Sequence, residues 1–207
     1  MDKKQLEIIL SQLKEPSLPK PSLEQYTITG NLAAEILNLA YLHGDIKDKV
    51  VFDFGTGSGR LAIGAAIFGA KFVVGIDIDK NVIRAAKENL KRHEYYTGKK
   101  LPVHFVVCDI KNWNSKADTI IQNPPFGIQS RHADRIFLEV ALRCGKRIYT
   151  LHKNGYKKTR EFIRKFVEER GGKIEQILKY KFSIPYMFKF HEKPKITYDV
   201  DLYIIEK

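Results

Sequence analysis

Residues 50–59 read Val-Val-Phe-Asp-Phe-Gly-Thr-Gly-Ser-Gly, and this stretch decides the fold. An apolar run of strand character ends around Asp53, and Gly55, Gly57 and Gly59 then alternate with other residues before a helical pattern begins. Glycines at such a turn let the backbone reverse sharply and approach a ligand closely. The stretch therefore predicts the first strand, ligand-binding turn and helix of an α/β sheet.

Residues on either side of this turn restrict what it can bind. A dinucleotide fingerprint requires a glycine three positions after Gly57, but this chain has Arg60 there. Asp53 would repel a pyrophosphate, whereas a carboxylate at this place can stabilise a cationic or amino-bearing cofactor. The Gly-x-Gly-x-Gly spacing preceded by an acid therefore favours S-adenosyl-L-methionine over a nicotinamide dinucleotide.

Apolar runs of strand length alternate with helical patterns along most of the chain. The strand patterns cover residues 50–54, 72–76, 103–107, 119–121 and 147–151, and the helical patterns cover residues 61–68, 81–93, 133–144 and 159–169. Such alternation predicts a parallel sheet with helices on both faces. Two longer strand patterns, residues 173–182 and 196–205, predict a closing antiparallel pair. We expect a Rossmann-like α/β fold with a mostly parallel seven-stranded sheet and an antiparallel last strand.

The beginning of the chain has a pattern of its own. Apolar residues at helical spacing cover residues 3–14, and three prolines between residues 16 and 21 forbid continuation of that helix. We therefore divide the chain into an N-terminal helix with an extended basic strap, residues 1–29, and an α/β domain, residues 30–207.

Acidic residues also follow the second and third strand patterns. Asp77 ends the second strand, from which a carboxylate can accept hydrogen bonds from both ribose hydroxyls. Asp109 follows the third strand, where it can accept from an adenine amine while Ile110 packs against the ring. Each acid alone could be an ordinary turn residue. Acids after three successive strands together predict a nucleoside-bearing cofactor at this edge of the sheet.

The fourth strand pattern runs into Asn123, Pro124, Pro125 and Phe126. The side-chain oxygen of Asn123 and the main-chain oxygen of Pro124 could accept both hydrogens of a planar amine, which frees the nitrogen to pyramidalise. The prolines stiffen the turn, and Phe126 offers a ring on which a splayed base can stack. The alternative is a proline-rich turn capped by a core phenylalanine. Beside a methyl-donor site, the turn predicts methylation of an sp² nitrogen such as the adenine amine.

The charge balance indicates a polyanionic partner. Lys and Arg number 36 against 24 Asp and Glu in 207 residues, which gives a formal net charge of +12. Nucleic acid is the first candidate for such a chain, although basic side chains can also form an ordinary solvated face and the aromatic ones can belong to the core. The residues expected to contact RNA are Lys153, Lys157, Lys158, Tyr186, Phe188, Lys189 and His191.

Other classes of protein are disfavoured. No apolar stretch approaches the roughly 20 residues that cross a bilayer, so we expect no membrane span. Cys108 and Cys144 lack metal-type spacing, and no signal peptide is evident. We therefore expect a cytoplasmic protein without a metal site.

The ordered motifs resemble those of class I S-adenosylmethionine-dependent methyltransferases, and more closely those of the methyltransferase-like protein 5 family. The resemblance runs from about residue 5 to the end of the chain. It rests on Glu24-Gln25-Tyr26, Val50-Val51-Phe52-Asp53, Gly75-Ile76-Asp77-Ile78-Asp79, Cys108-Asp109, Asn123-Pro124-Pro125-Phe126-Gly127, Thr150-Leu151-His152-Lys153 and the alternate aromatics of Tyr186, Phe188 and Phe190 with His191.

That family makes N6-methyladenosine in small-subunit ribosomal RNA, so the resemblance implies this activity here. It also implies that Gln25 and the following residues close over the methionine end of the cofactor, with Ile28 where the family pattern has a threonine. The complete set of expected cofactor residues is Gln25, Tyr26, Ile28, Thr29, Asp53, Gly55, Gly57, Ser58, Gly59, Asp77, Ile78, Asp109, Ile110 and Asn123.

A protein partner is a further implication of the resemblance. The family commonly works with a Trm112-type zinc-binding activator protein that pairs with an edge strand. Residues 103–107 would form that edge, and they are apolar and almost free of charge. The alternative is that a helix of the same chain covers this strand.

Three rival functions stay open on the sequence. A protein glutamine-N5 methyltransferase must activate a similar amide nitrogen and uses a nearly identical turn, and guanine-N2 methylation is another candidate. A non-catalytic RNA-binding assembly factor could keep the same fold. The net charge of +12 favours a polyanionic substrate over a protein, and the intact motifs argue against a scaffold.

Overall fold

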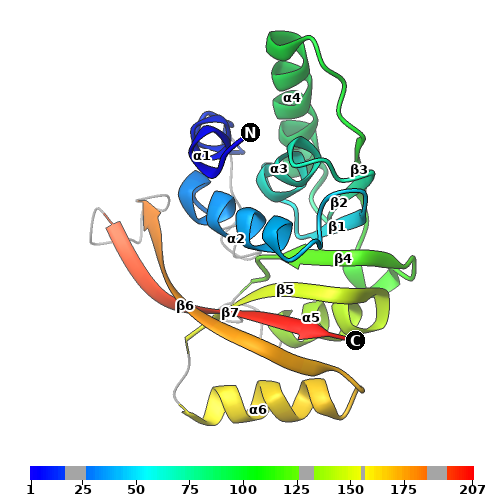
Figure 1. Cartoon of the computed structure of the whole chain (residues 1–207), viewed down its shortest axis with the longest axis vertical. Helices are drawn as coiled ribbons and strands as arrows, with labels where there is room; N and C mark the ends of the chain where they lie inside the picture. The colour runs from blue at the N-terminus through cyan, green and yellow to red at the C-terminus, as the bar shows by residue number, and fades with distance from the viewer. Residues whose placement is uncertain (17–26, 126–132, 155–156, 186–194) are drawn as a thin grey trace.

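The computed structural model describes residues 1–16, 27–125, 133–154, 157–185 and 195–207. The strands in these ranges are β1 (Val50–Phe54), β2 (Phe72–Asp77), β3 (Val103–Val107), β4 (Ala117–Gln122), β5 (Gly145–Lys153), β6 (Lys173–Pro185) and β7 (Lys195–Glu206). They form one sheet in the order β3-β2-β1-β4-β5-β7-β6 (Figure 1). β1 to β5 run parallel, and β7 is antiparallel to both of its neighbours. The predicted Rossmann-like sheet is confirmed.

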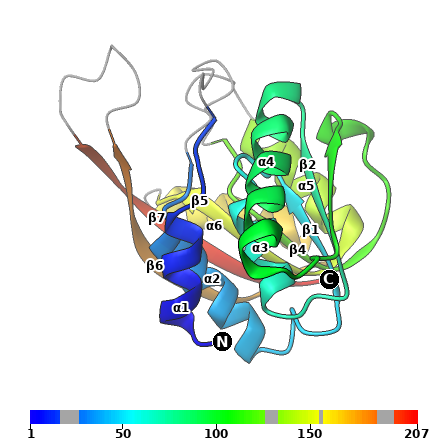
Figure 2. The same ribbon diagram turned by 90° about the horizontal axis from the view of Figure 1, so that it is seen from above.

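Helices cover both faces of this sheet. They are α1 (Lys3–Ser11), α2 (Gly30–Leu42), α3 (Arg60–Ile67), α4 (Lys80–Thr97), α5 (Ala133–Cys144) and α6 (Lys157–Glu168). α1, α2 and α3 lie on one face, with α4 beside α3, while α5 and α6 lie on the other (Figures 1 and 2). Because β1 to β5 are parallel, their carboxyl ends meet at a single edge of the sheet.

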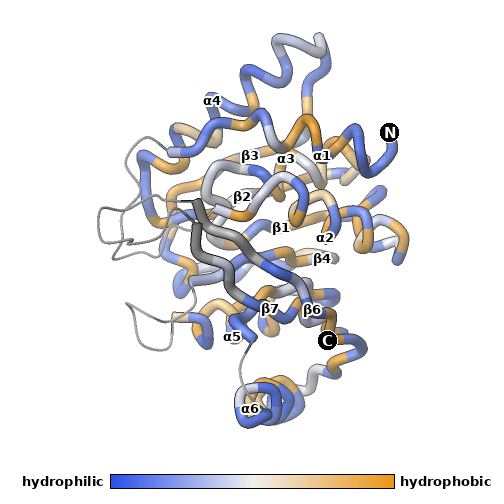
Figure 3. Tube along the Cα trace, turned by 90° about the vertical axis from the view of Figure 1, so that its left-hand side faces the viewer, coloured by the Kyte–Doolittle hydropathy of each residue, from blue (hydrophilic) through white to orange (hydrophobic). Residues whose placement is uncertain are grey.

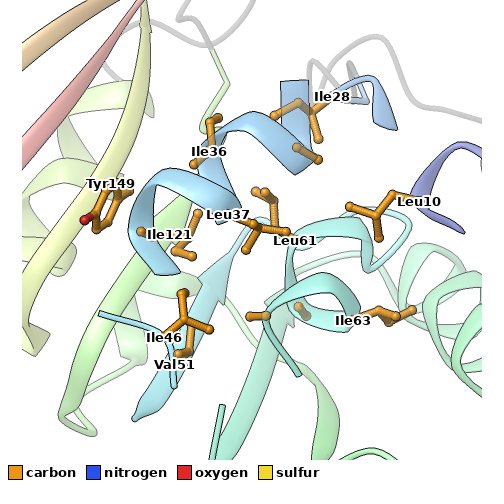
Figure 4. Close-up of a cluster of buried hydrophobic side chains, with 14 of the residues drawn as sticks. Leu10, Ile28, Ile36, Leu37, Ile46, Val51, Leu61, Ile63, Ile121 and Tyr149 are labelled. Atoms are coloured by element: carbon orange, nitrogen blue, oxygen red, sulfur yellow. The ribbon is translucent and has the colours of Figure 1, made fainter. Parts of the chain in front are cut away.

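The larger core lies between the sheet and the first three helices, and Figure 4 shows side chains from α1, α2, α3 and the strands in contact there. Leu6 and Leu10 of α1 are fully buried in this core. α1 approaches α2 closely because Gly30 has no side chain, and a Cβ atom there would lie 2.6 Å from the backbone nitrogen of Ser11. The N-terminal helix therefore packs into the same core as the sheet.

A second core lies between the opposite face of the sheet and α5 and α6. Ile163 and Val167 of α6 are buried in it, and the tube of α6 in Figure 3 is otherwise largely hydrophilic. Phe52 of β1 meets Trp113 edge to face, with ring centroids 5.4 Å apart. Burial on both faces explains why β1 is apolar almost throughout.

Tertiary contacts move several element boundaries away from the sequence pattern. α1 ends at Ser11 and not at residue 14, since the backbone N–H of Lys14 donates to the side chain of Asn89 on α4. α6 begins at Lys157, before the predicted residue 159 and six residues before its first buried side chain, Ile163. β6 and β7 are longer than predicted, and their register shifts between Ile174 and Gln176.

None of the helices in the described ranges has both the length and the apolar character needed to cross a membrane.

Candidate active site

A pocket of about 260 Å³ opens at the carboxyl ends of β1 to β4. This volume is close to the roughly 300 Å³ at which small-molecule sites begin. Of the residues expected to bind the cofactor, those that line the pocket are Ile28, Gly55, Gly57, Ser58, Asp77, Ile78, Asp109, Ile110 and Asn123. Four strand ends that are distant in sequence thus meet in one place, as expected for an open α/β sheet.

The glycine turn after β1 adopts backbone conformations that favour glycine. The φ angles of Gly55, Gly57 and Gly59 are +70°, +54° and +81°. The backbone N–H groups of Gly55 and Thr56 donate to the carbonyl oxygen of Ile76 on β2, at 2.8 and 2.9 Å. The turn is therefore fixed to the neighbouring strand.

Gly59 is expected to contact the cofactor but does not line the pocket. A Cβ atom at Gly59 would lie 2.7 Å from the ring of Phe105 on β3. The same ring lies 2.6 Å from where a Cβ atom of Gly75 would be. The packing beneath the turn and the backbone angle of +81° therefore account for a glycine at position 59.

Asp53 is also expected at the cofactor, but it is buried below the turn and is absent from the described pocket lining. Its Oδ2 accepts hydrogen bonds from Thr56 Oγ1 at 2.6 Å and from the backbone N–H of Ala62 at 3.1 Å. Its Oδ1 has no hydrogen-bond partner among the described residues. Burial raises the pKa of Asp53 to about 7, and the two hydrogen bonds oppose this shift. The carboxyl group supports the turn from beneath.

Asp77 ends β2 and faces the pocket. Its Oδ2 accepts from the backbone N–H of Gly57 at 3.2 Å, and its Oδ1 accepts from that of Asp79 at 3.0 Å. Burial raises the pKa of Asp77, while these backbone bonds lower it. A carboxylate offers about four acceptor positions, so both oxygens can still accept from a ribose.

Asp109 and Ile110 line the pocket from the segment that follows β3, because the strand itself ends at Val107. Asp109 caps the short 3₁₀ helix Ile110–Asn112, and its Oδ1 accepts from the backbone N–H of Lys111 at 3.0 Å. The remaining acceptor positions of the carboxylate are suited to an adenine amine.

Asn123 and Pro125 line the same pocket directly after β4, and Pro124 between them is buried. Phe126, the expected stacking ring, lies outside the described residues. The turn is therefore placed beside the glycine turn, as the sequence predicts.

The strand residue before this turn is held by a buried polar chain. Gln122 Nε2 donates to Thr150 Oγ1 at 2.9 Å, and Thr150 Oγ1 lies 3.0 Å from His152 Nε2. Burial lowers the pKa of His152 to about 4, so the imidazole is neutral at physiological pH. The end of β4 is thus connected by side chains to β5.

Curated proteins include relatives that match nearly the whole chain. The rRNA N6-adenosine-methyltransferase METTL5 of Danio rerio is 34% identical, over 97% of this chain and 97% of the relative. The chain belongs to the METTL5 family. An uncharacterized protein of Methanocaldococcus jannaschii is 44% identical to this chain, over 99% of this chain and 94% of the relative.

A solved structure agrees with this placement, and a family model of a methyltransferase matches part of the chain. The crystal structure of a candidate RNA methyltransferase from Pyrococcus horikoshii has a TM-score of 0.90 and 40% identity, and the match covers 100% of this chain and 98% of that one. A family model described as ribosomal protein L11 methyltransferase matches residues 29–124 of the present chain. That match contains the cofactor strands and stops inside the Asn123 turn.

S-adenosyl-L-methionine is the cofactor of this METTL5 family member, and the residues around the pocket fit it. Asp77 would hold the ribose, and Asp109 with Ile110 would hold the adenine. Ser58 lines the pocket, and its buried Oγ has no hydrogen-bond partner among the described residues. A buried hydroxyl of this kind is suited to a polar group of a bound ligand.

The N-terminal side of the pocket is formed by Pro16, Thr27 and Ile28. Thr29 is expected here too, but it does not line the pocket. Its Oγ1 accepts from the backbone N–H of Leu32 at 3.3 Å, which makes it the N-cap of α2. The predicted contacts of Gln25 and Tyr26 lie outside the described residues.

One wall of the pocket is missing from the sequence prediction. Ala133, Ile136 and Phe137 of α5 line it, and the ring of Phe137 lies 3.1 Å from where a Cβ atom of Gly55 would be. The available signal was the apolar pair in the first turn of the helix that follows the Asn123 turn. The helical pattern by itself predicts only a helix over residues 133–144.

The predicted RNA contacts are described only in part. Lys153, Lys157 and Lys158 are exposed near the end of β5 and the start of α6, and Lys157 lies 3.9 Å from Glu161. The other four residues lie outside the described ranges, namely Tyr186, Phe188, Lys189 and His191.

β3 is an edge strand, as the predicted pairing with an activator requires. Val103 and Phe105 are each 7% exposed, whereas Val107 is 51% exposed. The chain's own packing therefore covers two of these residues, and the carboxyl end of the strand stays open to solvent.

Proposed function

We propose that this protein transfers a methyl group from S-adenosyl-L-methionine to the exocyclic N6 amine of an adenosine in small-subunit ribosomal RNA. The observation that carries the proposal is that Asn123 and Pro125 line the same pocket as Gly55 and Asp77. The residues proposed as amine acceptors and those proposed for the cofactor thus line one pocket. Full-length similarity to an rRNA N6-adenosine-methyltransferase supports the same substrate.

The role of the chain is to hold the target amine and to redirect its lone pair. Asn123 Oδ1 and the carbonyl oxygen of Pro124 accept the two N–H hydrogens, which draws the nitrogen out of conjugation with the ring. Two successive prolines restrict φ, so the acceptors stay aligned. When bound, S-adenosyl-L-methionine supplies a methyl group on a positively charged sulfur, and the methylated nitrogen releases one proton. Phe126 would stack on the base.

RNA would approach along the side of the molecule where β5 ends. Lys153, Lys157 and Lys158 are exposed there, and the whole chain carries a formal charge of +12. Lysines near a target pocket neutralise phosphates without reading sequence. Tyr186, Phe188, Lys189 and His191, which lie outside the described residues, are the remaining proposed RNA contacts.

A protein substrate is the second candidate, and one observation favours it. The family model for ribosomal protein L11 methyltransferase matches residues 29–124, which include the first residues of the amine-binding turn. That match does not extend to the second half of the chain, where the exposed lysines lie. The RNA proposal accounts for both halves.

We further propose that a Trm112-type zinc-binding protein pairs with β3 and that the complex works in the cytoplasm, where small ribosomal subunits are used. The edge position of β3 and the exposure of Val107 support strand addition at this place.

The experiment compares two acceptors for a labelled methyl group. Purified protein, with and without a Trm112-type partner, is incubated with labelled cofactor and either ribosomal RNA from a strain lacking this protein or a termination-factor protein. We expect label in RNA, recovered as N6-methyladenosine at one position of the small-subunit RNA.

The other outcomes are equally informative. Label only in the protein acceptor would reject the RNA substrate. Cofactor binding without transfer to either acceptor, in the presence of the partner, would support a non-catalytic assembly factor. Asn123→Ala serves as the inactive control, and Asn114→Ala, an exposed residue on the loop before β4, serves as its matched active control.

A further inference from the structure

Arg60 carries a buried charge at the first residue of α3, and its guanidinium bonds to two stretches near the start of the chain, residues 10–16 and 27–28, together termed the N-terminal segment. It is only 5% exposed. Its Nε donates to the carbonyl oxygen of Leu10 at 2.9 Å, and one terminal nitrogen donates to that of Leu13 at 3.3 Å. The other terminal nitrogen donates to the carbonyl oxygen of Ile28. An ion pair of 2.7 Å with Glu15 completes the set.

Asn89 of α4 forms a second connection to the same segment. It is 3% exposed. Its Nδ2 donates to the carbonyl oxygens of Lys14 and Ser58, both at 2.9 Å, and its Oδ1 accepts from the backbone N–H of Lys14 at 2.9 Å. One amide thus bonds the N-terminal segment and the glycine turn at once.

These bonds attach a wall of the cofactor pocket to its floor. Pro16 and Ile28 line the pocket from the N-terminal segment, whereas Ser58 and Arg60 line it from the turn and α3. A buried guanidinium without acceptors is costly, so Arg60 strongly favours the arrangement in which the segment stays in place. Leu10 and Ile28 pack beside Leu61 in the same core (Figure 4).

We propose that Arg60 and Asn89 are positioning residues for the cofactor site. Together they hold the N-terminal segment against the glycine turn before the cofactor arrives, so that the cofactor meets a preformed pocket. Preorganised walls raise affinity because less ordering is left to occur on binding. Arg60, which stands where a dinucleotide fingerprint would have a glycine, therefore anchors the N-terminal segment.

The opposing view is that both residues stabilise the fold without affecting the cofactor. The two views differ in what is measured. Anchoring changes the cofactor dissociation constant in proteins that remain folded, whereas a purely structural role changes only stability, seen in the unfolding midpoint and in the amide exchange of Lys14.

The test uses three variants of the full chain. Asn89→Leu removes both donors, Arg60→Lys keeps a charge but loses the three-carbonyl fork, and Glu15→Gln removes only a half-exposed charge and is the mildest. The matched controls are Arg84→Lys and Glu88→Leu, at exposed positions of α4. Cofactor affinity is measured by calorimetry, and hydrogen exchange of the Lys14 amide is measured by NMR.

For Asn89→Leu and Arg60→Lys we expect a rise of about tenfold or more in the cofactor dissociation constant, equivalent to about 1.4 kcal/mol. Glu15→Gln should give a smaller rise in the same direction, and the controls should match the wild type. Exchange at Lys14 should accelerate in Asn89→Leu.

Folded variants with wild-type affinity would overturn the proposal, even if Lys14 exchanges faster. If the two stronger variants do not fold, Glu15→Gln decides, and unchanged affinity in it would overturn the proposal as well. No methyl acceptor enters these measurements, so the result is independent of whether the substrate is RNA.

Discussion

The cofactor side and the target side of the pocket are built in different ways. At the ends of β1 and β2, side chains are fixed by backbone groups nearby in sequence, since Asp53 bonds Ala62 and Asp77 bonds Asp79. At the end of β4, the buried side chain of Gln122 is fixed through Thr150, which is 28 residues away. The cofactor side therefore combines bonds that are local in sequence with longer ones, such as that from Gly57 to Asp77, whereas the bond described on the target side joins two strands that are distant in sequence.

Asn123→Ala should break the target side and leave the cofactor side intact. Loss of one oriented acceptor typically lowers kcat by about 10²–10³-fold. Steady-state methylation of ribosomal RNA measures this, and calorimetry should give a cofactor affinity close to wild type. A large loss of affinity would contradict the role assigned to the amide.

Asp77→Ala should have the opposite effect. Hydrogen bonds to a charged group contribute about 1.5–3 kcal/mol, so we expect a rise of about 10–100-fold in the cofactor dissociation constant. Turnover at saturating cofactor should change little. Asp118→Ala, which removes a carboxylate near the amino end of β4, is the control and should leave affinity unchanged.

Asp53→Asn tests the buried support of the turn through the pH dependence of stability. The folded pKa is about 7 and the ordinary value is 3.8, so the folded protein keeps a proton that the unfolded chain releases. The resulting stabilisation is fully present below pH 3.8 and is lost as pH rises through about 7. Relative to Asp53→Asn, the wild type should lose up to about 1.4 kcal/mol per pH unit between these values.

Urea unfolding of both proteins at several pH values between 4.5 and 7.5 measures this difference. The comparison with the neutral variant cancels the contributions of other carboxylates, including Asp118 and Glu94, whose pKa values are lowered. A constant difference across the range would show that Asp53 is ionised in the folded protein.

The smallest effect is expected for the exposed lysines on the target side. In the double variant Lys157→Ala, Lys158→Ala, RNA affinity should fall modestly for all sequences, and the slope of affinity against salt should decrease by about one per lost phosphate contact. Filter binding across a salt series measures both. The double variant Lys47→Ala, Lys71→Ala, exposed at the amino end of the sheet, should match the wild type.

Most residues predicted for the cofactor side line the pocket, because the sequence signals for them are short in range. Strand patterns ending in Asp77 and in the glycine turn fix both the fold and the edge at which the pocket opens. The exceptions are informative. The sequence spacing alone suggests that Asp53 and Gly59 contact the cofactor. The burial of Asp53 and the position of the Phe105 ring beside Gly59 depend on tertiary packing, which the spacing does not encode.

The remaining parts of the site depend on packing that no spacing encodes. Phe137 becomes a wall only because α5 returns over the glycine turn. In the sequence, Arg60 served only to exclude a dinucleotide-binding fingerprint. Its hydrogen bonds to Leu10 and Ile28 join residues 50 and 32 positions apart, so they could not be predicted from the sequence. Thr29, expected at the cofactor, is instead used by the first turn of α2.

The ring of Phe105 extends from the edge strand β3 into the core of the protein. It belongs to the outermost strand, yet it fills the space that Gly59 and Gly75 leave under the glycine turn. A protein that added a strand beside β3 would contact the strand whose Phe105 side chain supports the glycine turn. Binding of such a protein to β3 and binding of the cofactor in the pocket would then be energetically linked through Phe105.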